Sequence, residues 1–272
     1  SWVLVNGNLF YTSQLPKSYI IINFFYKSPE FILFCYVIFI LFIIINKKFF
    51  LSQFDYFWNK IFLVLLILLF PIIYFIFLPF RVYDGLRLFL NIIPYFCIIP
   101  GLTIYYLIYN FDSLISKILS GFVISSFVYY LFIFFILTPY QYTYLNLFTG
   151  NFSNAHQKFE NDYWAISIKE LINKIPTETN LISNNKKVKI AYCGVPHDIT
   201  DKELHKLKNF KFEKKDLYNE NFDYVIMTNR LDGERDSVSL AGVKTCFDRI
   251  KGVDIITVDR NGLILSTLRK KI

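Results

Sequence analysis

The strongest constraint on the fold of this chain is a set of long apolar stretches without a charged residue. A helix needs about 20 largely apolar residues to cross a bilayer, and residues 61–80, 88–109 and 118–137 each reach that length. Residues 31–46 form a shorter stretch, which local thinning of the bilayer and flanking lysines can accommodate. Three such stretches in a row argue against buried helices of a soluble protein. The sequence therefore predicts four transmembrane helices.

Charged residues are distributed unevenly along the chain. They make up 18% of the 272 residues, below the roughly 25% of a soluble domain, while 54% are hydrophobic. Residues 1–137 contain 8 basic and 4 acidic side chains, whereas residues 138–272 contain 21 and 17. Both halves carry the same net charge, so the overall +8 forms no basic stripe and we expect no nucleic-acid partner. The predicted fold class is a polytopic α-helical membrane bundle followed by a small α/β soluble domain.

The first 30 residues are interpreted as a loop with an interfacial helix. Residues 18–26 are apolar but too short to cross a membrane, which is typical of a helix lying in the interface. They lack the charged flank and cleavage site of a signal peptide. The residues before them are read as a loop. Because the chain starts at Ser1 within that loop, we expect a fragment or a processed product.

An aromatic segment follows the last predicted span. It carries Tyr140, Tyr142, Tyr144, Tyr163 and Trp164. Tyrosine and tryptophan favour the headgroup layer, so these residues are expected at the membrane surface. With the amphipathic helix after it, the segment makes up residues 138–183, between the bundle at 31–137 and an α/β domain at 184–272.

Capping boxes and apolar periodicity predict two helices in the second half. A capping box at residues 167–170 opens a helix that Pro176 ends. A second box at residues 200–203 opens a helix that extends to about Asn209. The first helix has one apolar face, made of Ile168, Leu171, Ile172 and Ile175.

The remaining pattern of the second half predicts strands and one more helix. Residues 188–193 and 223–228 are read as buried strands, and residues 238–250 as a helix. The strands at residues 253–258 and 263–268 flank Asn-Gly, the strongest short hairpin signal.

The cysteines and histidines give no metal motif. Cys193 and Cys246 could form a disulfide if their domain faces an oxidising compartment, and two thiols without a spacing rule leave that open. Cys35 and Cys97 are expected to pack within spans. The three histidines are scattered, so we expect no zinc site, and no cofactor motif is present.

The most informative polar cluster lies between the second and third long stretches. It contains Arg81, Tyr83, Asp84 and Arg87. Guanidinium groups suit phosphate oxygens, so one interpretation is a clamp on an anionic lipid headgroup. The other is a tight turn with snorkelling arginines and an Asp–Arg pair.

Several segments, in order, resemble one family. Residues 83–90 (YDGLRLFL), followed by Pro94, resemble the YDG-x-RHFLF…P segment of bacterial polyprenyl-phosphate-dependent glycosyltransferases. These enzymes form glycosyltransferase family 39 and its relatives in the multi-spanning C-class superfamily. Residues 15–19 are similar to the family's LPWYY, residues 139–164 to its HPYQYVYFN…GG…DYWG, and residues 258–266 to its closing segment. The chain departs from the family at Leu88, Thr138 and Ala165.

The resemblance implies the C-terminal part of a transferase that moves a sugar from a polyprenyl-phosphate donor to an acceptor hydroxyl. The family's catalytic acidic loop has no counterpart here, so we assign no catalytic residue to this chain. Arg87, then Arg81, would bind the leaving phosphate, with Asp84 orienting Arg87 and Tyr83 contacting lipid or sugar. The aromatic segment would contact acceptor or lipid.

The resemblance also implies a location. The short loops carry equal numbers of Lys and Arg on both sides, so charge alone does not orient the bundle. In such enzymes the C-terminal domain is extracytoplasmic, at the bacterial inner membrane. The resemblance therefore implies that the loop in residues 1–30, on the same side of four spans, is extracytoplasmic as well. Membrane lipid and the lipid-linked donor are the expected partners, and a divalent-metal requirement stays open. The alternative is a non-catalytic membrane-anchored module whose α/β domain binds a partner.

Overall fold

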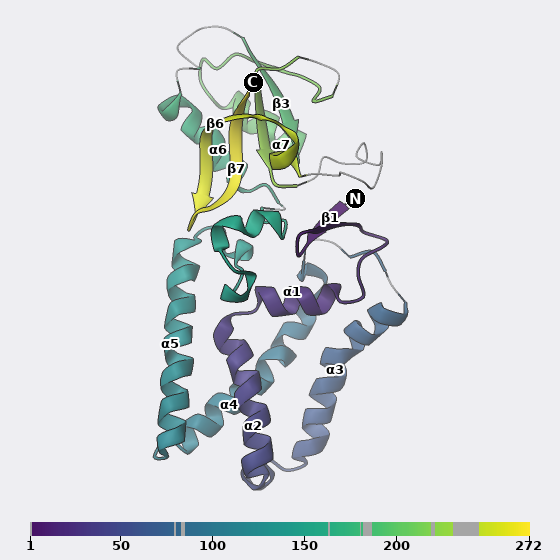
Figure 1. Cartoon of the computed structure of the whole chain (residues 1–272), viewed down its shortest axis with the longest axis vertical. Helices are drawn as coiled ribbons and strands as arrows, with labels where there is room; N and C mark the ends of the chain where they lie inside the picture. The colour runs from purple at the N-terminus through teal and green to yellow at the C-terminus, as the bar shows by residue number, and fades with distance from the viewer. Residues whose placement is uncertain are drawn as a thin grey trace. The chain divides into compact units, whose positions relative to one another are not determined.

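The computed structural model describes residues 2–78, 80–82, 85–162, 164–179, 181, 187–218, 221–230 and 245–272 (Figure 1). The chain divides into two compact units. A helical unit comprises Ser13–Phe135 and Leu145–Thr149. A sheet unit comprises Ser1–Thr12, Ile136–Tyr144 and Gly150–Ile272.

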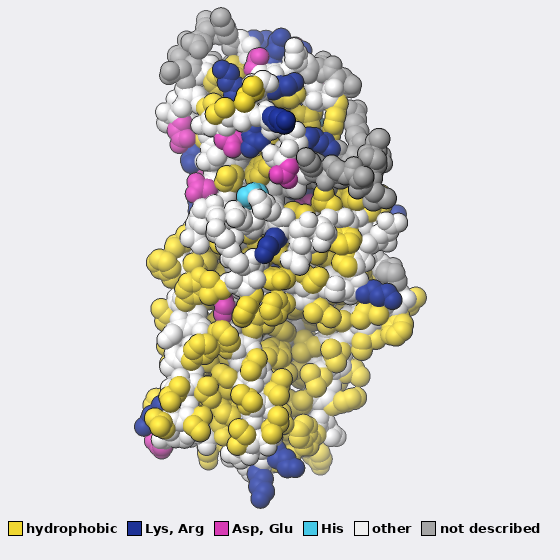
Figure 2. Space-filling model, in the orientation of Figure 1, with side chains coloured by type: hydrophobic (Ala, Val, Ile, Leu, Met, Phe, Trp, Pro, Cys, Tyr) yellow, Lys and Arg dark blue, Asp and Glu magenta, His cyan; other side chains and the backbone are white. Residues whose placement is uncertain are grey.

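Within the described residues, four helices are long and apolar enough to cross a membrane. Each contains most of one predicted span, so the predicted set of long apolar helices is confirmed. Figure 2 shows hydrophobic side chains over most of the visible face of the helical unit, as lipid-facing helices require. The four are α2 (Glu30–Gln53), α3 (Phe57–Phe77), the 3-10 turn η1 (Arg87–Ile92) joined to α4 (Ile93–Tyr109), and α5 (Leu114–Ile136).

Helix α2 extends beyond the predicted end of the first span. The prediction ended at Asn46, before two lysines, but the helix continues to Gln53 with a kink at Asn46 (φ −138°, ψ 51°). Phe49 and Phe50, after the lysines, are both buried. The Asn46 amide donates a hydrogen bond to the Tyr106 hydroxyl at 3.2 Å. Aromatic burial and this contact with α4 explain why the helix continues past a charged pair.

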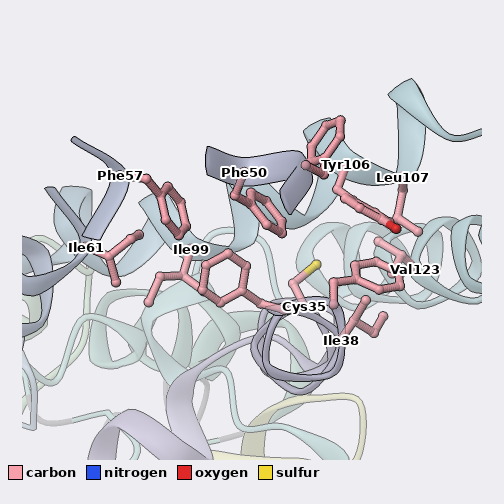
Figure 3. Packing of buried hydrophobic residues seen from close by; sticks show 12 residues of the cluster. Cys35, Ile38, Phe50, Phe57, Ile61, Ile99, Tyr106, Leu107 and Val123 are labelled. Atoms are coloured by element: carbon pink, nitrogen blue, oxygen red, sulfur yellow. The ribbon is translucent and has the colours of Figure 1, made fainter. Parts of the chain in front are cut away.

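The core of the helical unit is an aromatic and aliphatic cluster drawn from all four long helices (Figure 3). The Phe50 and Phe57 rings stack with centroids 5.3 Å apart, and Phe42 lies 4.0 Å from Tyr106. The buried Thr103 hydroxyl donates to the Cys35 carbonyl at 2.9 Å, which ties α4 to α2. Figure 3 labels Cys35, Ile38, Phe50, Phe57, Ile61, Ile99, Tyr106, Leu107 and Val123.

Prolines are accommodated inside the long helices. Pro71 lies within α3 and Pro100 within α4. Pro94 lies in the first turn of α4, where the backbone N–H has no helical partner. The 3-10 turn before it explains why the predicted third span is not one continuous α-helix.

The short helix predicted at residues 18–26 is present as α1 (Tyr19–Lys27), and its position in a membrane interface stays a prediction. Ser28 and Pro29 separate it from α2, and Figure 1 draws it crosswise to that helix. The N-cap of α2 is Pro29, so the chain changes direction between the two helices.

The sheet unit is built on five strands in the order β4-β3-β5-β7-β6. β3 pairs in parallel with β4 and β5, and β7 pairs antiparallel with β5 and β6. The strands are β3 (Val188–Cys193), β4 (Phe212–Lys214), β5 (Tyr224–Thr228), β6 (Gly252–Arg260) and β7 (Leu263–Lys271).

The predicted strands are confirmed, with small changes at their ends. β3 matches its predicted range, and the Asn-Gly hairpin joins β6 to β7 with Arg260 opposite Leu263. Asn261 and Gly262 have φ values of 51° and 77°, the left-handed conformations that a two-residue turn of this kind needs.

Helix α6 (Ser167–Glu178) has the predicted apolar face, but its predicted capping box is wrong. The backbone N–H groups of Ile166 and Ser167 donate to the Asp162 carboxylate at 3.0 and 2.9 Å. Asp162 therefore satisfies the helix N-terminus, and Glu170 is left to bind Arg260. The helix also passes Pro176, because a proline in the last turn removes only one helical donor.

Helix α7 (His197–His205) starts before the predicted box and ends before Asn209. Thr200 lies within the helix, where its hydroxyl donates to the Pro196 carbonyl at 2.9 Å, so it caps nothing. Asn209 has a left-handed φ of 64°, which is incompatible with a continuing helix.

Cys193 and Cys246 form a disulfide, with Cα atoms 5.7 Å apart. Cys246 begins the short helix α8 (Cys246–Arg249), and the rest of the helix predicted at 238–250 lies largely outside the described residues. Cys35 is buried as predicted, whereas the prediction that Cys97 packs within the bundle is wrong, since it is exposed on α4.

The N-terminal residues form a hairpin, so their prediction as a loop is wrong. β1 (Trp2–Val5) pairs antiparallel with β2 (Asn8–Tyr11). Asn6 and Gly7 make the turn with φ values of 46° and 85°. This is the same Asn-Gly signal that predicted the β6–β7 hairpin.

Candidate functional site

Gly85, in the polar turn between α3 and η1, lies against one face of α1. Tyr19, Asn23 and Lys27 share this face because residues four apart lie above one another on a helix. Tyr19 and Asn23 are buried and Lys27 is half-buried. The Gly85 backbone N–H donates to the Tyr19 hydroxyl at 3.1 Å, and the Asn23 amide donates to the Tyr19 carbonyl at 2.9 Å. The turn is therefore anchored on the short helix.

Gly85 is required by both its conformation and its surroundings. Its φ is 65°, in the left-handed region that side chains other than glycine rarely adopt. A Cβ atom at this position would collide with the Lys27 ammonium group and lie 3.4 Å from the Asn23 amide oxygen. The Lys27 ammonium therefore lies directly against the backbone of the turn.

The predicted arginines occupy the two sides of Gly85 in the sequence. Arg81 and Arg87 are both exposed, and Arg87 is the first residue of η1. Tyr83 and Asp84 lie outside the described residues, so the predicted orientation of Arg87 by Asp84 stays a prediction. The structure adds Lys27 to this turn. Two polar residues four apart on an otherwise apolar helix could have identified it from the sequence.

The loop at residues 145–149, here called the closing loop, contacts the corner where α1 ends and α2 begins. The Asn146 backbone N–H donates to the Tyr26 carbonyl at 2.9 Å. Its side-chain amide donates to the carbonyls of Phe25 and Ser28 at 2.5 and 3.0 Å. The N–H of the next residue donates to the Glu30 carboxylate at 2.8 Å. These bonds satisfy carbonyl groups that the end of α1 leaves without helical partners, so they fix the helix that carries Lys27.

No protein-family model, curated protein or solved structure matches this chain. The resemblance to lipid-dependent glycosyltransferases is thus a hypothesis carried by the residues themselves.

The aromatic segment belongs to the sheet unit up to Tyr144, and its residues are not equally exposed. Tyr140 and Tyr144 are buried and Tyr142 is half-buried, while the Trp164 side chain is 47% exposed. The Tyr142 hydroxyl donates to the Asp162 carboxylate, and its ring centroid lies 6.0 Å from that of Trp164. Tyr163 lies outside the described residues. Among the described members, Trp164 offers the most exposed ring.

Tyr140 takes part in a charged cluster with Glu170 and Arg260. Its hydroxyl donates to Glu170 at 2.8 Å, and the Arg260 guanidinium lies over its ring, 4.9 Å from the centroid. Burial and the hydrogen bond to Glu170 raise the pKa of Tyr140 above its ordinary range. Burial tends to raise the pKa of Glu170, but hydrogen bonds from Arg260 and Tyr140 outweigh it, and the pKa is lowered. Tyr140 is therefore held as a neutral hydrogen-bond donor.

No group of three or more His, Cys, Asp or Glu side chains suited to a metal ion occurs within the described residues. The metal requirement of the chain stays open. The described cations near Gly85 are Lys27, Arg81 and Arg87, and guanidinium and ammonium groups are suited to anionic ligands.

Proposed function

We propose that this chain is the C-terminal part of a membrane glycosyltransferase of the bacterial inner membrane. It would transfer a sugar from a polyprenyl-phosphate-linked donor to an acceptor hydroxyl on the extracytoplasmic face. The observation that carries the proposal is the turn on α1, where Gly85 lies against the Lys27 ammonium between Arg81 and Arg87.

The reaction needs positive charge near the leaving group. The bond between the anomeric carbon and the phosphate oxygen breaks, the acceptor oxygen bonds to that carbon, and the acceptor proton goes to a base outside this chain. Polyprenyl phosphate leaves with one more negative charge than the donor carried. Fixed cations at that position stabilise the transition state more than the ground state.

The side chains at the turn suit that role. A guanidinium group offers paired donors to phosphate oxygens, and an ammonium group offers a compact charge. The buried Tyr19 hydroxyl accepts a hydrogen bond from the Gly85 backbone N–H, and Asn23 bonds to the Tyr19 carbonyl within α1. The Gly85 backbone is therefore held before a ligand binds, which lowers the entropy cost of binding.

Exposed apolar residues beside α1 support a position in the membrane interface. Ile21 and Phe25 of α1 and Leu147 and Phe148 of the closing loop are all exposed. The Phe25 and Phe148 rings lie 5.3 Å apart. An apolar surface of this kind suits the acyl boundary of a bilayer, where an isoprenoid chain would also lie.

The disulfide supports the extracytoplasmic placement. Disulfides persist in oxidising compartments and are rare in the cytosol. The bond between Cys193 and Cys246 therefore favours a sheet unit on the side where lipid-linked donors are used in the resembling enzymes.

The test is sugar transfer by the longer protein that contains this chain, reconstituted with a lipid-linked donor. Arg87→Gln and Lys27→Gln should each lower kcat by about a hundredfold, the effect typical of removing one transition-state donor. Arg87→Lys should recover part of the loss. Lys60→Gln, at an exposed lysine in the first turn of α3, is the matched control. Wild-type turnover by both Arg87→Gln and Lys27→Gln at normal expression would reject the clamp.

One observation favours the alternative of a membrane-anchored interaction module. The sheet unit has its own buried core, made of Ala191, Cys193, Phe222, Val225, Met227, Cys246 and Ile250. The module hypothesis predicts that coding sequence just before Ser1 holds no further spans. An in-frame upstream extension with spans and an acidic loop would favour the transferase.

A further inference from the structure

A pocket in the sheet unit, distant in sequence from the turn on α1, lies where three strands of the sheet meet. β5 and β6 begin and β7 ends at this point. The Lys271 backbone N–H donates to the Asp223 carbonyl at 2.9 Å, and Gly252 pairs with Lys271. The sheet therefore brings together the segments before β5, before β6 and at the end of β7, near the C mark in Figure 1. They line an open pocket of about 330 Å³, at the lower end of the range for small-molecule sites.

The pocket combines apolar walls with cations. Leu217, Ile250 and the two rings of Tyr218 and Phe222 supply the apolar part. Ile272, the last residue of the sequence, and three cationic side chains complete the lining, and no described lining residue carries a carboxylate side chain. The cations are Arg249, Lys251 and Lys271.

Two of the cations are held in place by the aromatic rings. The Lys271 ammonium lies 4.3 Å from the Phe222 ring centroid. The Arg249 guanidinium lies over the Tyr218 ring at 5.6 Å and donates to its hydroxyl at 2.6 Å. Such cation–π contacts restrict flexible side chains without neutralising their charge. The positive charge is therefore positioned before any ligand arrives.

The two pocket lysines differ in ion pairing from several other cations of the sheet unit. Lys214 pairs with Asp201, Arg260 with Glu170, and Arg269 with Asp254. In the part of the chain that the structure describes, neither the Lys251 nor the Lys271 ammonium has a carboxylate partner. Their charge is thus available to an external anion.

We propose that this pocket binds a small anionic saccharide, that is, a single sugar ring bearing a phosphate or carboxylate. The ammonium and guanidinium groups recognise the anion, and the apolar and aromatic walls contact the ring. An inorganic anion would contact only the cationic groups, and a neutral sugar would contact only the apolar and aromatic walls. The assignment does not depend on transferase activity, because binding is measured without turnover.

The experiment is calorimetric titration of the whole chain in detergent with glucose 1-phosphate, glucose and inorganic phosphate. Glucose 1-phosphate should bind at least about tenfold more tightly than either of the others, since it alone uses both sets of contacts. The double variant Lys251→Gln/Lys271→Gln should lose about tenfold or more of that affinity. Lys208→Gln, at an exposed lysine outside the pocket, should bind as the wild type does.

Three results would overturn the proposal. They are no saturable binding of glucose 1-phosphate at millimolar concentration, equal affinity for inorganic phosphate, and unchanged affinity in the double variant. An unchanged circular dichroism spectrum and melting temperature would show that the double variant is folded. If it is not, Lys251→Gln alone provides the same comparison.

Discussion

The Arg260 guanidinium makes two hydrogen bonds with the Glu170 carboxylate, from Nη2 to Oε2 at 2.6 Å and from Nη1 to Oε1 at 3.2 Å. Both side chains are less than one third exposed. The Nε group of Arg260 also donates to the Thr138 carbonyl at 3.2 Å. A residue at the tip of the β6–β7 hairpin thus joins α6 to the segment that follows α5.

Removing this arginine should destabilise the sheet unit. We expect Arg260→Ala to lower the free energy of unfolding by about 1.5–3 kcal/mol, because hydrogen bonds to a charged and partly buried partner are lost. Arg260→Lys should recover only part, since an ammonium group cannot form the paired contact. Thermal unfolding followed by circular dichroism measures both, with Lys208→Ala as the control. A melting temperature for Arg260→Ala equal to that of the control would contradict the role of the pair.

The same pair predicts a dependence of stability on pH. The folded-state pKa of Glu170 lies below its ordinary value of 4.5. The ionised carboxylate therefore contributes stability that is fully present above pH 4.5 and is lost as the pH falls through the lowered pKa. The difference in melting temperature between wild type and Glu170→Gln should be largest near neutral pH and should shrink at acidic pH. A difference that does not vary with pH would show that Glu170 keeps an ordinary pKa.

Substitution of Gly85 should disrupt the turn on α1. Gly85→Ala places a side chain in a left-handed conformation, at a cost of about 1–2 kcal/mol, and against the Lys27 ammonium. Gly101→Ala in α4 is the matched control, because its added Cβ meets nothing within 4 Å. The melting temperature should fall for Gly85→Ala and stay level or rise for Gly101→Ala.

A second substitution separates the two causes. Adding Lys27→Ala to Gly85→Ala removes the collision but leaves the backbone strain, so we expect partial recovery of the melting temperature. Full recovery would mean that the backbone conformation is not strained. No recovery would mean that Lys27 does not lie against the turn.

The disulfide should be detectable by counting thiols and by its effect on stability. The chain has four cysteines, so a maleimide should label two per unfolded chain without reductant and four after reduction. Cys193→Ser should lower stability by about 2–4 kcal/mol, whereas Cys97→Ser, at an exposed free thiol, should not. Four labelled thiols before reduction would show that the bond does not form.

Features set by short-range sequence patterns were predicted well. The long helices, β3, β5 and the Asn261-Gly262 hairpin depend on apolar periodicity or on two turn residues. The hairpin at Asn6-Gly7 carried the same signal and could have been predicted from it. The capping box at residues 167–170 was wrong for a different reason. Asp162, five residues before Ser167, satisfies the start of α6, and Glu170 is drawn to Arg260, 90 residues away. Tertiary partners of this kind leave no local pattern.

The residues of the candidate site were likewise predictable only where a local sequence pattern marks them. Arg81 and Arg87 could be identified from their own segment, because charged residues between apolar spans are conspicuous. Sequence spacing alone could not predict that Lys27 lies near this segment, since two long helices separate α1 from the turn. Their association depends on the Tyr19 hydroxyl and on the absence of a side chain at Gly85.

The loop at residues 145–149 has a consequence for the order of assembly. Asn146 bonds to the Ser28 carbonyl 118 residues earlier in the chain. A nascent chain therefore cannot complete the corner between α1 and α2 until all four long helices have been synthesised. Until then the short helix that bears Lys27 lacks its C-terminal restraint. The corner between α1 and α2 is thus among the last parts of the helical unit to be completed, and a chain stopped within α5 would lack the bonds that Asn146 makes there.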